Sequence, residues 1–283
     1  MFLLIGYVII LASALGTYAV HGSLAALFVP TEYIAIVGLL IGGFVASNNP
    51  SSLKAAVGGL SAVFKNSPYT RAFYIELLAL LFEILTKVRK EGLMSIEQDV
   101  ENPEGSAIFG KYPLVLHDHH VVEFITDYLR MMVSGSLNAI EIEGLMEQEI
   151  ETHHIEAHLP AHLIAKAADS VPAFGIVVAV MGVVNVMGSV GEPPAVLGKM
   201  IGGALVGTFL GILVSYGFVG PIASQLELKV EDGSKPFQVA KVVLLASMNG
   251  YPPQMAVEFG RKVLWSTVRP TFAELEEELK NRK

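Results

Sequence analysis

The chain is poor in the residues that support several common kinds of chemistry. None of its 283 residues is cysteine, which excludes disulfides, thiolate metal sites and cysteine nucleophiles. Only 16% of the residues are charged, against about 25% in an ordinary soluble domain. The net charge is -8. Proteins that bind phosphate backbones usually carry an excess of positive charge, so a nucleic-acid partner is not expected. With 52% hydrophobic residues, the composition favours a membrane protein over a soluble enzyme.

The low charge content results from four segments that contain almost no charged residues. No Lys or Arg precedes Lys54, and Glu32 is the only carboxylate in that stretch. A membrane-spanning helix needs about 20 mostly apolar residues. The sequence therefore predicts four transmembrane helices, in the runs Phe2–Val20, Tyr33–Ser47, Ser170–Gly191 and Met200–Ile222. A cleavable signal peptide is the alternative for the first run, but that run lacks a basic n-region and is too long for a typical h-region.

The basic residues predict the orientation of these spans. Nine of the nineteen lie between Lys54 and Lys166, nine more lie from Lys229 onward, and none lies between the first two spans. The positive-inside rule then places the polar middle, the tail and both termini in the cytoplasm. We expect an all-α integral membrane protein with a large helical cytoplasmic domain. Its four parts are a first membrane hairpin (1–50), a cytoplasmic domain (51–169), a second hairpin (170–222) and a cytoplasmic tail (223–283).

Helical periodicity and end signals predict the elements outside the membrane. Apolar residues at three- and four-residue spacing favour one helix over Arg71–Lys90, which Gly92 ends. Ser95 with Gln98, and Thr271 with Glu274, match capping boxes that begin new helices. Further helical patterns cover His120–Ile150, Phe237–Ser247 and Met255–Trp265, and no β-pattern is found.

Eight histidines raise the possibility of a metal site. The densest group is His153, His154, His158 and His162, but Pro160 is expected to interrupt the helix and no His-Glu-x-x-His motif is present. We therefore favour surface or capping roles for these residues and for the histidines at 117, 119 and 120. Nucleophile-elbow and phosphate-loop motifs are absent from the sequence as well. We expect no metal, no cofactor and no enzymatic activity.

The predicted spans lack the groups that move ions. Their interiors contain no Asp, Glu, Lys, Arg or His, and Glu32 is expected at the edge of the second span. Ion paths through membranes normally use such residues, so a partner helix is expected to supply one if this chain conducts. Small residues at four-residue spacing, above all Gly203, Gly207 and Gly211, favour close helix packing. Pro172 and Pro221 either mark the ends of the third and fourth spans or act as a pair of hinges.

Seven segments, in order along the chain, carry a family resemblance: Lys87–Gly92, Ser95–Asp99, Glu101–Pro103, Asp169–Ile176, Val206–Gly211, Tyr216–Pro221 and Glu258–Lys262. Together they resemble the MotA family of bacterial flagellar stator subunits. The resemblance implies a homopentamer around a MotB-type single-span partner that supplies the ion-binding Asp, in the bacterial inner membrane. It implies that proton flow through this complex drives the flagellar rotor.

The resemblance also assigns roles to individual residues. Arg89 and Glu97 match the rotor-contact positions, which engage the rotor switch protein. Pro172, Pro221, Thr208 and Asp169 match positions of the ion path and its coupling. One alternative is a TolQ- or ExbB-like proton-channel energiser of an envelope process, which would lack the Arg89 and Glu97 match. The others are a self-contained channel, which should carry its own intramembrane ionisable residue, and a membrane scaffold.

Overall fold

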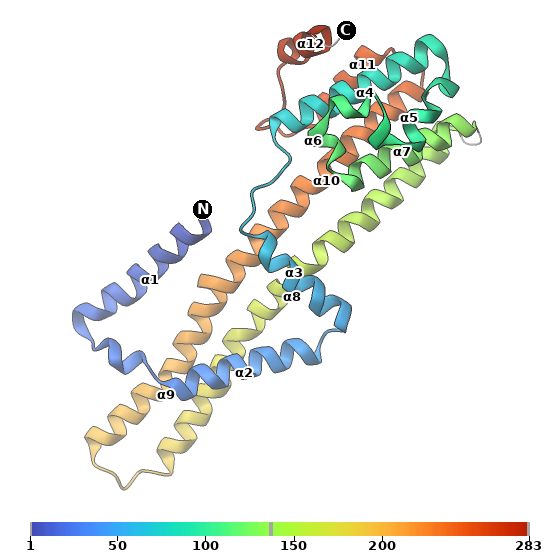
Figure 1. The fold of residues 1–283 in the computed structure, drawn as a ribbon. Helices are drawn as coiled ribbons and strands as arrows, with labels where there is room; N and C mark the ends of the chain where they lie inside the picture. Colours follow the sequence, from blue (N-terminus) through green and yellow to red (C-terminus); the bar gives the residue numbers. More distant parts are fainter. Residues whose placement is uncertain (1, 136–137, 282–283) are drawn as a thin grey trace. The chain divides into compact units, whose positions relative to one another are not determined.

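A computed structural model describes residues 2–135 and 138–281, and within these ranges every regular element is helical (Figure 1). The chain divides into two compact units. The first contains residues 1–66 and 157–228, and the second contains residues 67–156 and 229–283. Two long helices, α8 (Ala139–Met187) and α10 (Gly220–Met248), contribute residues to both units.

The first unit contains the membrane segments. Its helices are α1 (Phe2–His21), α2 (Pro30–Ala46), α3 (Pro50–Ala62), α9 (Pro194–Val214) and the adjoining parts of α8 and α10. Four segments are long and apolar enough to cross a bilayer, which confirms the predicted number of spans: Phe2–His21, Leu24–Ala46, Ala139–Met187 and Pro194–Met248. Proline begins α2, α3 and α9, where its missing N–H leaves no helical hydrogen bond unmade.

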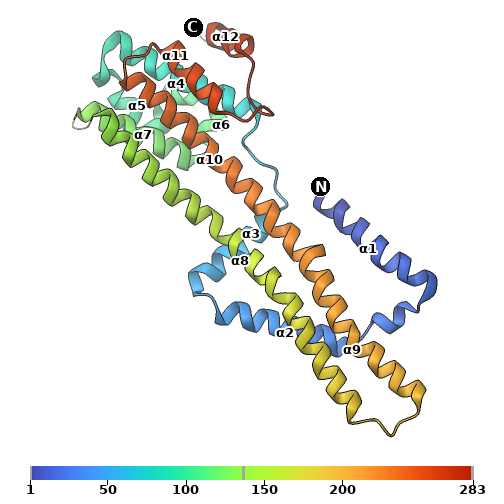
Figure 2. The ribbon, with the colours of Figure 1, turned by 180° about the vertical axis from the view of Figure 1, so that it is seen from behind.

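The centre of this unit is the antiparallel pair formed by α8 and α9. The two helices lie side by side and are joined by a short connection (Figures 1 and 2). Val171 and Val178 of α8 pack against Val206 and Leu210 of α9, and Ile36 of α2 completes this buried cluster. Helix α2 therefore contacts the pair, and the pair is the frame on which the candidate site is built.

One expectation about these helices was wrong, and another covered only part of a helix. Pro160 does not interrupt α8, which continues through both Pro160 and Pro172. A single proline removes one hydrogen bond, and the bonds on either side together with packing keep a long helix intact. Gly59 of α3 lies so close to Pro160 that a methyl group on it would be 2.8 Å from the proline Cβ. The predicted helix Phe237–Ser247 is the second half of α10, which begins at Gly220.

The second unit is built around α4 (Arg71–Glu91), as the apolar periodicity predicts. Thr70 caps its start by accepting a hydrogen bond from the Phe73 N–H, and Gly92 ends it with φ 86°. Around α4 lie α7 (His119–Ser134), α11 (Pro253–Val263), α12 (Phe272–Asn281), the second half of α10 and two short helices, α5 (Glu97–Glu101) and α6 (Pro113–Leu116) (Figure 1). Their buried apolar side chains form one continuous core.

The stretch His120–Ile150 is two helices rather than one. Gly135 ends α7 in the left-handed conformation, with φ 66°, a geometry that glycine adopts without steric cost. Asn138 then begins α8, since its side-chain oxygen accepts from the backbone N–H groups of Ile140 and Glu141. Residues 136 and 137 lie outside the described ranges. The signal for the break was Gly135, which the helical pattern alone does not weigh.

The two predicted capping boxes have different outcomes. Thr271 and Glu274 form the reciprocal pair, with the Thr271 N–H donating to the Glu274 carboxylate at 2.6 Å and the Glu274 N–H donating to the Thr271 hydroxyl at 3.3 Å. At the other site the prediction was wrong. The Ser95 hydroxyl donates back to the Gly92 carbonyl at 2.6 Å and lies within a 3₁₀ turn, Leu93–Ile96, that leads into α5.

The histidines do not gather into a metal site within the described ranges. His153 differs from the surface or capping role that we expected. Its ring packs 4.6 Å from that of Phe237 on α10 and 5.9 Å from that of His120 on α7, as measured between ring centroids. Burial, followed by the nearby His120, lowers the pKa of His153, so the neutral ring is favoured in this packed position.

Candidate functional site: the α8–α9 pair and the exposed end of α4

The α8–α9 pair is held at backbone contact by glycines. A methyl group on Gly175 would lie 2.7 Å from the carbonyl oxygen of Gly207, and one on Gly211 would lie 2.9 Å from the Gly175 Cα. Gly207 and Gly211 thus face α8. Gly203 does not share this contact, because the Cβ position there has open space apart from a Val29 methyl at 4.0 Å. Ala204 instead lies against Gly182, next along the seam.

Glu32 lies in the first turn of α2, against this pair. A methyl group on Gly207 would be 3.0 Å from the Oε2 atom of Glu32. That oxygen is buried and has no hydrogen-bond partner in the described part of the chain. A buried carboxylate oxygen without a partner is costly, which marks Glu32 as a candidate functional residue. The sequence signal was present, since Glu32 is the lone charge in a long uncharged stretch, but the sequence did not show that its carboxylate contacts α9.

The residues matched to the ion path lie at different places on the first unit. Asp169 is exposed on α8, and with Pro221 it lines an open cleft of about 370 Å³ that also contains Glu227. Pro172 lies one turn further along α8, inside the helix. Thr208 is half-buried on α9, beside Gly207, and does not line this cleft. The structure therefore brings Asp169 and Pro221 together but leaves Thr208 apart.

Arg89 and Glu97 are both exposed on the second unit, on either side of the turn that follows α4. Arg89 lies in the last turn of α4 and Glu97 begins α5. Neither side chain forms an ion pair in the described part of the chain, whereas many nearby charged residues do. Between them Met94 is 64% exposed, while Ile96 is fully buried and anchors the turn. The segment thus presents opposite charges and an apolar side chain at the surface.

A buried polar network fixes the turn that carries Glu97. Asp99 is 9% exposed. It accepts a hydrogen bond from the Ser106 hydroxyl at 2.6 Å and one from the Lys87 ammonium at 2.8 Å. The Ser106 hydroxyl oxygen in turn accepts from the backbone N–H groups of Ile108 and Phe109. The network ties α4, α5 and the following loop together, and sequence reasoning did not identify it because it joins separate segments.

We expect Asp99→Ala to loosen this turn. Removal of the carboxylate leaves the Ser106 hydroxyl and the Lys87 ammonium without their partner, a loss of about 1–3 kcal/mol. Amide hydrogen exchange of Leu93–Glu101 in the purified full chain should accelerate about five- to a hundredfold. Asp127→Ala is the matched control, because Asp127 pairs with Arg130 at the surface and such pairs contribute little. Equal protection in both variants would contradict the role given to Asp99.

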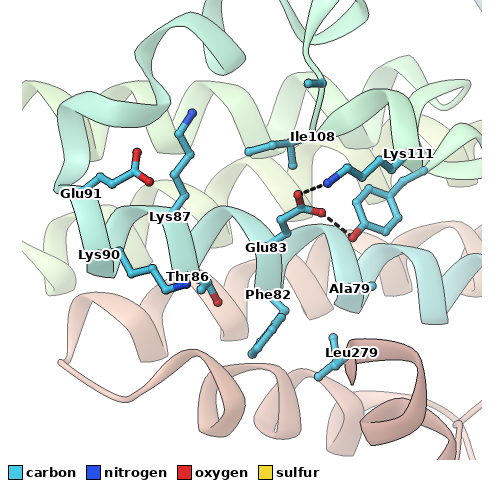
Figure 3. Close-up of a pocket in the computed structure, with 12 residues that line it drawn as sticks. Ala79, Phe82, Glu83, Thr86, Lys87, Lys90, Glu91, Ile108, Lys111 and Leu279 are labelled. Carbon is cyan, nitrogen blue, oxygen red and sulfur yellow. Dashed lines mark hydrogen bonds and ion pairs between the residues drawn. The ribbon is translucent and has the colours of Figure 1, made fainter. Parts of the chain in front are cut away.

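A cleft of about 570 Å³ lies along the face of α4 next to these charges (Figure 3). Glu83 holds its wall by pairing with Lys111 and by accepting a hydrogen bond from the Tyr112 hydroxyl at 2.9 Å, as the dashed lines of Figure 3 show. Lys87, Lys90 and Glu91 line the end nearest Arg89. The face of α4 therefore presents charged side chains of both signs along this cleft.

These features define the class of protein. Four apolar segments of spanning length, a glycine-packed helix pair and a separate helical unit with exposed charges belong to a polytopic membrane protein. Residues 4–92 match the family model described as Motility protein A N-terminal, and residues 117–238 match that of the MotA/TolQ/ExbB proton channel family.

Curated relatives identify the family. The chain is 49% identical to motility protein A of Escherichia coli over 281 residues, which cover 99% of this chain and 95% of that protein. It is 34% identical to the chemotaxis protein LafT of Vibrio parahaemolyticus, with 96% of each chain covered. The chain belongs to the motility protein A family. These relatives favour the flagellar interpretation over the TolQ- or ExbB-like alternative, and the family is one of proton-channel subunits rather than enzymes.

Solved structures have the same fold. The flagellar MotAB stator complex from Bacillus subtilis matches with a TM-score of 0.74 at 24% identity, covering 97% of this chain and 98% of that one. C. jejuni MotAB matches with a TM-score of 0.73 at 20% identity, covering 93% and 95%. The all-α membrane architecture predicted from the sequence is confirmed by these matches and by the four spanning segments.

Proposed function

We propose that this chain is the ion-channel and torque-generating subunit of a flagellar stator. Together with a MotB-type single-span subunit it forms a path for protons, and proton flow moves the cytoplasmic unit against the flagellar rotor. The observation that carries the proposal is the 49% identity to a motility protein A over nearly the whole length of both chains. The MotAB complexes among the structural matches support a partner of the MotB type.

The partner explains the composition of the membrane segments. Glu32 is the only carboxylate before Glu76, and the other three uncharged runs hold no ionisable carboxylate or amine. The MotB-type helix supplies the Asp that binds the ion, while Thr208, Pro172, Pro221 and Asp169 of this chain serve the path and its coupling to movement. The basic residues of the middle and the tail support cytoplasmic termini in the bacterial inner membrane. Five copies surround the partner in this proposal.

Arg89 and Glu97 form the contact with the rotor switch protein. Their exposure and lack of ion pairs within the described chain leave both charges available to groups of opposite sign. Exposed ion pairs contribute about 0.2–1 kcal/mol each. Contacts of that strength form and break readily, as a stepping motor requires.

Reconstitution into liposomes tests the division of labour between the subunits. The chain alone should conduct no protons under an imposed membrane potential, and co-reconstitution with its MotB-type partner should produce proton flux, measured with an internal pH dye. A partner whose membrane Asp is replaced by Asn serves as the matched control and should conduct none. Robust flux through the chain alone would contradict the proposal that the partner provides the essential carboxylate.

A further inference from the structure

Pro172 deprives one backbone carbonyl in the first unit of its usual hydrogen bond within the helix. A proline in a helix interior has no N–H to donate to the carbonyl four residues earlier, which here is the carbonyl of Ala168. The Ser215 hydroxyl, from the end of the neighbouring helix, donates a hydrogen bond to that carbonyl at 2.7 Å. Ser215 is fully buried. The hydrogen bond that Pro172 cannot make within α8 is thus replaced by one that joins α8 to a second helix.

Ser215 also begins an unusual helical segment. Residues Ser215–Val219 form a π-helix between α9 and α10, and Pro221 follows within the first turn of α10. In a regular α-helix the Pro221 ring would press on the carbonyl of Gly217, and the wider π-turn relieves that contact. Pro172 therefore interrupts the hydrogen bonding of α8, and Pro221 follows the π-segment at the start of α10. The hydrogen bond from Ser215 to the Ala168 carbonyl connects these two irregular sites.

A second hydroxyl holds the same segment from α1. The Tyr7 hydroxyl donates to the Phe218 carbonyl at 2.7 Å, and the two rings lie 4.9 Å apart between centroids. Gly217 allows this approach, since a methyl group on it would lie 3.3 Å from a side-chain carbon of Ile10 on α1. The Ser215 hydroxyl thus joins the π-segment to α8, and the Tyr7 hydroxyl joins it to α1.

A π-segment can convert to α-helix by shifting one residue of register, which turns one side of the helix relative to the other by about 100°. Hydrogen bonds to α8 and α1 oppose such a shift. We propose that Ser215 and Tyr7 are positioning residues that hold the Ser215–Val219 segment in its π form and so link movement at Pro172 to movement at Pro221 during the torque cycle. This inference rests on the proposed stator function.

The test uses the full chain, expressed with its MotB-type partner in a non-motile strain that lacks both. Ser215→Ala and Tyr7→Phe remove the hydroxyls, and Ser215→Thr keeps one. Ser13→Ala and Tyr18→Phe on α1 are matched controls, because neither side-chain hydroxyl donates a hydrogen bond in the described structure. Torque is measured from a bead on the flagellum as stator units join one at a time, and membrane abundance is measured by immunoblot.

The height of a single torque step separates coupling from assembly, since poor folding reduces the number of steps and not their height. We expect Ser215→Ala and Tyr7→Phe to lower the step height by about twofold or more, a size typical of shifts caused by single interhelical hydrogen bonds in membranes. Ser215→Thr should restore it. If the two hydroxyls acted independently, the fold reductions in step height would multiply in the double variant. We expect a smaller reduction than that product, because both hydroxyls act on one segment.

Hydrogen exchange of the purified complex gives a second measurement that does not need motility. Amides of residues 215–223 should exchange several-fold faster in the Ser215→Ala and Tyr7→Phe complexes than in the controls. Unchanged step height together with unchanged exchange in both variants would overturn the inference. Failure of the unaltered chain to restore swimming would overturn the proposed function instead, so the two failures are distinguishable.

Discussion

Replacement of Gly211 by alanine should abolish swimming. The added methyl group would lie 2.9 Å from the Gly175 Cα and 3.0 Å from the Val171 carbonyl oxygen. Both are backbone atoms of α8, and they cannot rotate away as a side chain can. The two helices must therefore separate, and the close packing that joins them is lost along the seam. Gly175→Ala should act in the same way, because its methyl group would meet the backbone of α9.

Gly198→Ala provides the matched control for both substitutions. Gly198 lies on α9 as well, but a methyl group there would meet no atom within 4 Å. This variant should accumulate in the membrane and support swimming, whereas Gly211→Ala and Gly175→Ala should fail in swimming plates and lose protein from the membrane fraction. Normal swimming of the Gly211→Ala strain would contradict the backbone contact described for α8 and α9.

Charge reversal at both proposed rotor-contact positions should stop rotation while leaving assembly intact. Arg89→Glu combined with Glu97→Lys turns two attractions into two repulsions, and like charges at a contact oppose engagement more strongly than the loss of a weak pair. Both side chains are exposed and have no ion pair in the described structure, so folding should be unaffected. Membrane abundance should equal that of the unaltered chain, and torque on a tethered cell should fall close to zero.

A partner with compensating changes makes this test specific. Reversal of the opposing charges on the rotor switch protein should restore part of the torque, because the attractions return with opposite sign. Glu104→Lys is the control for a general effect of surface charge, since Glu104 is exposed on the same unit and was not matched to a rotor contact. A motile strain carrying both reversals without compensation would show that Arg89 and Glu97 do not contact the rotor.

Local signals in the sequence predicted the elements whose own residues determine them. Helix α4 follows from its apolar spacing and from Gly92, and the start of α12 follows from Thr271 and Glu274. Elements that depend on other segments were missed. Pro160 was expected to end a helix, but a helix end also depends on the neighbouring turns and on packing, as Gly59 shows.

The candidate site divides in the same way. Arg89 and Glu97 were proposed from sequence resemblance, and the structure shows that both are exposed. The Glu32 carboxylate could not be placed against Gly207, nor the Ser215 hydroxyl against Ala168, because each contact joins residues far apart in the chain. Periodicity and motif spacing describe one segment at a time and carry no information about such pairs.

The seam between α8 and α9 also limits where protons travel. Where Gly175 meets Gly207 and Gly211, main chain lies directly on main chain, and this leaves no room for a file of water molecules between the two helices. Under the proposed function, a hydrated route passes along an outer face of the pair, where the MotB-type partner lies. The glycines thus seal the contact between α8 and α9, and under the proposed function conduction depends on the assembled complex and not on the single subunit.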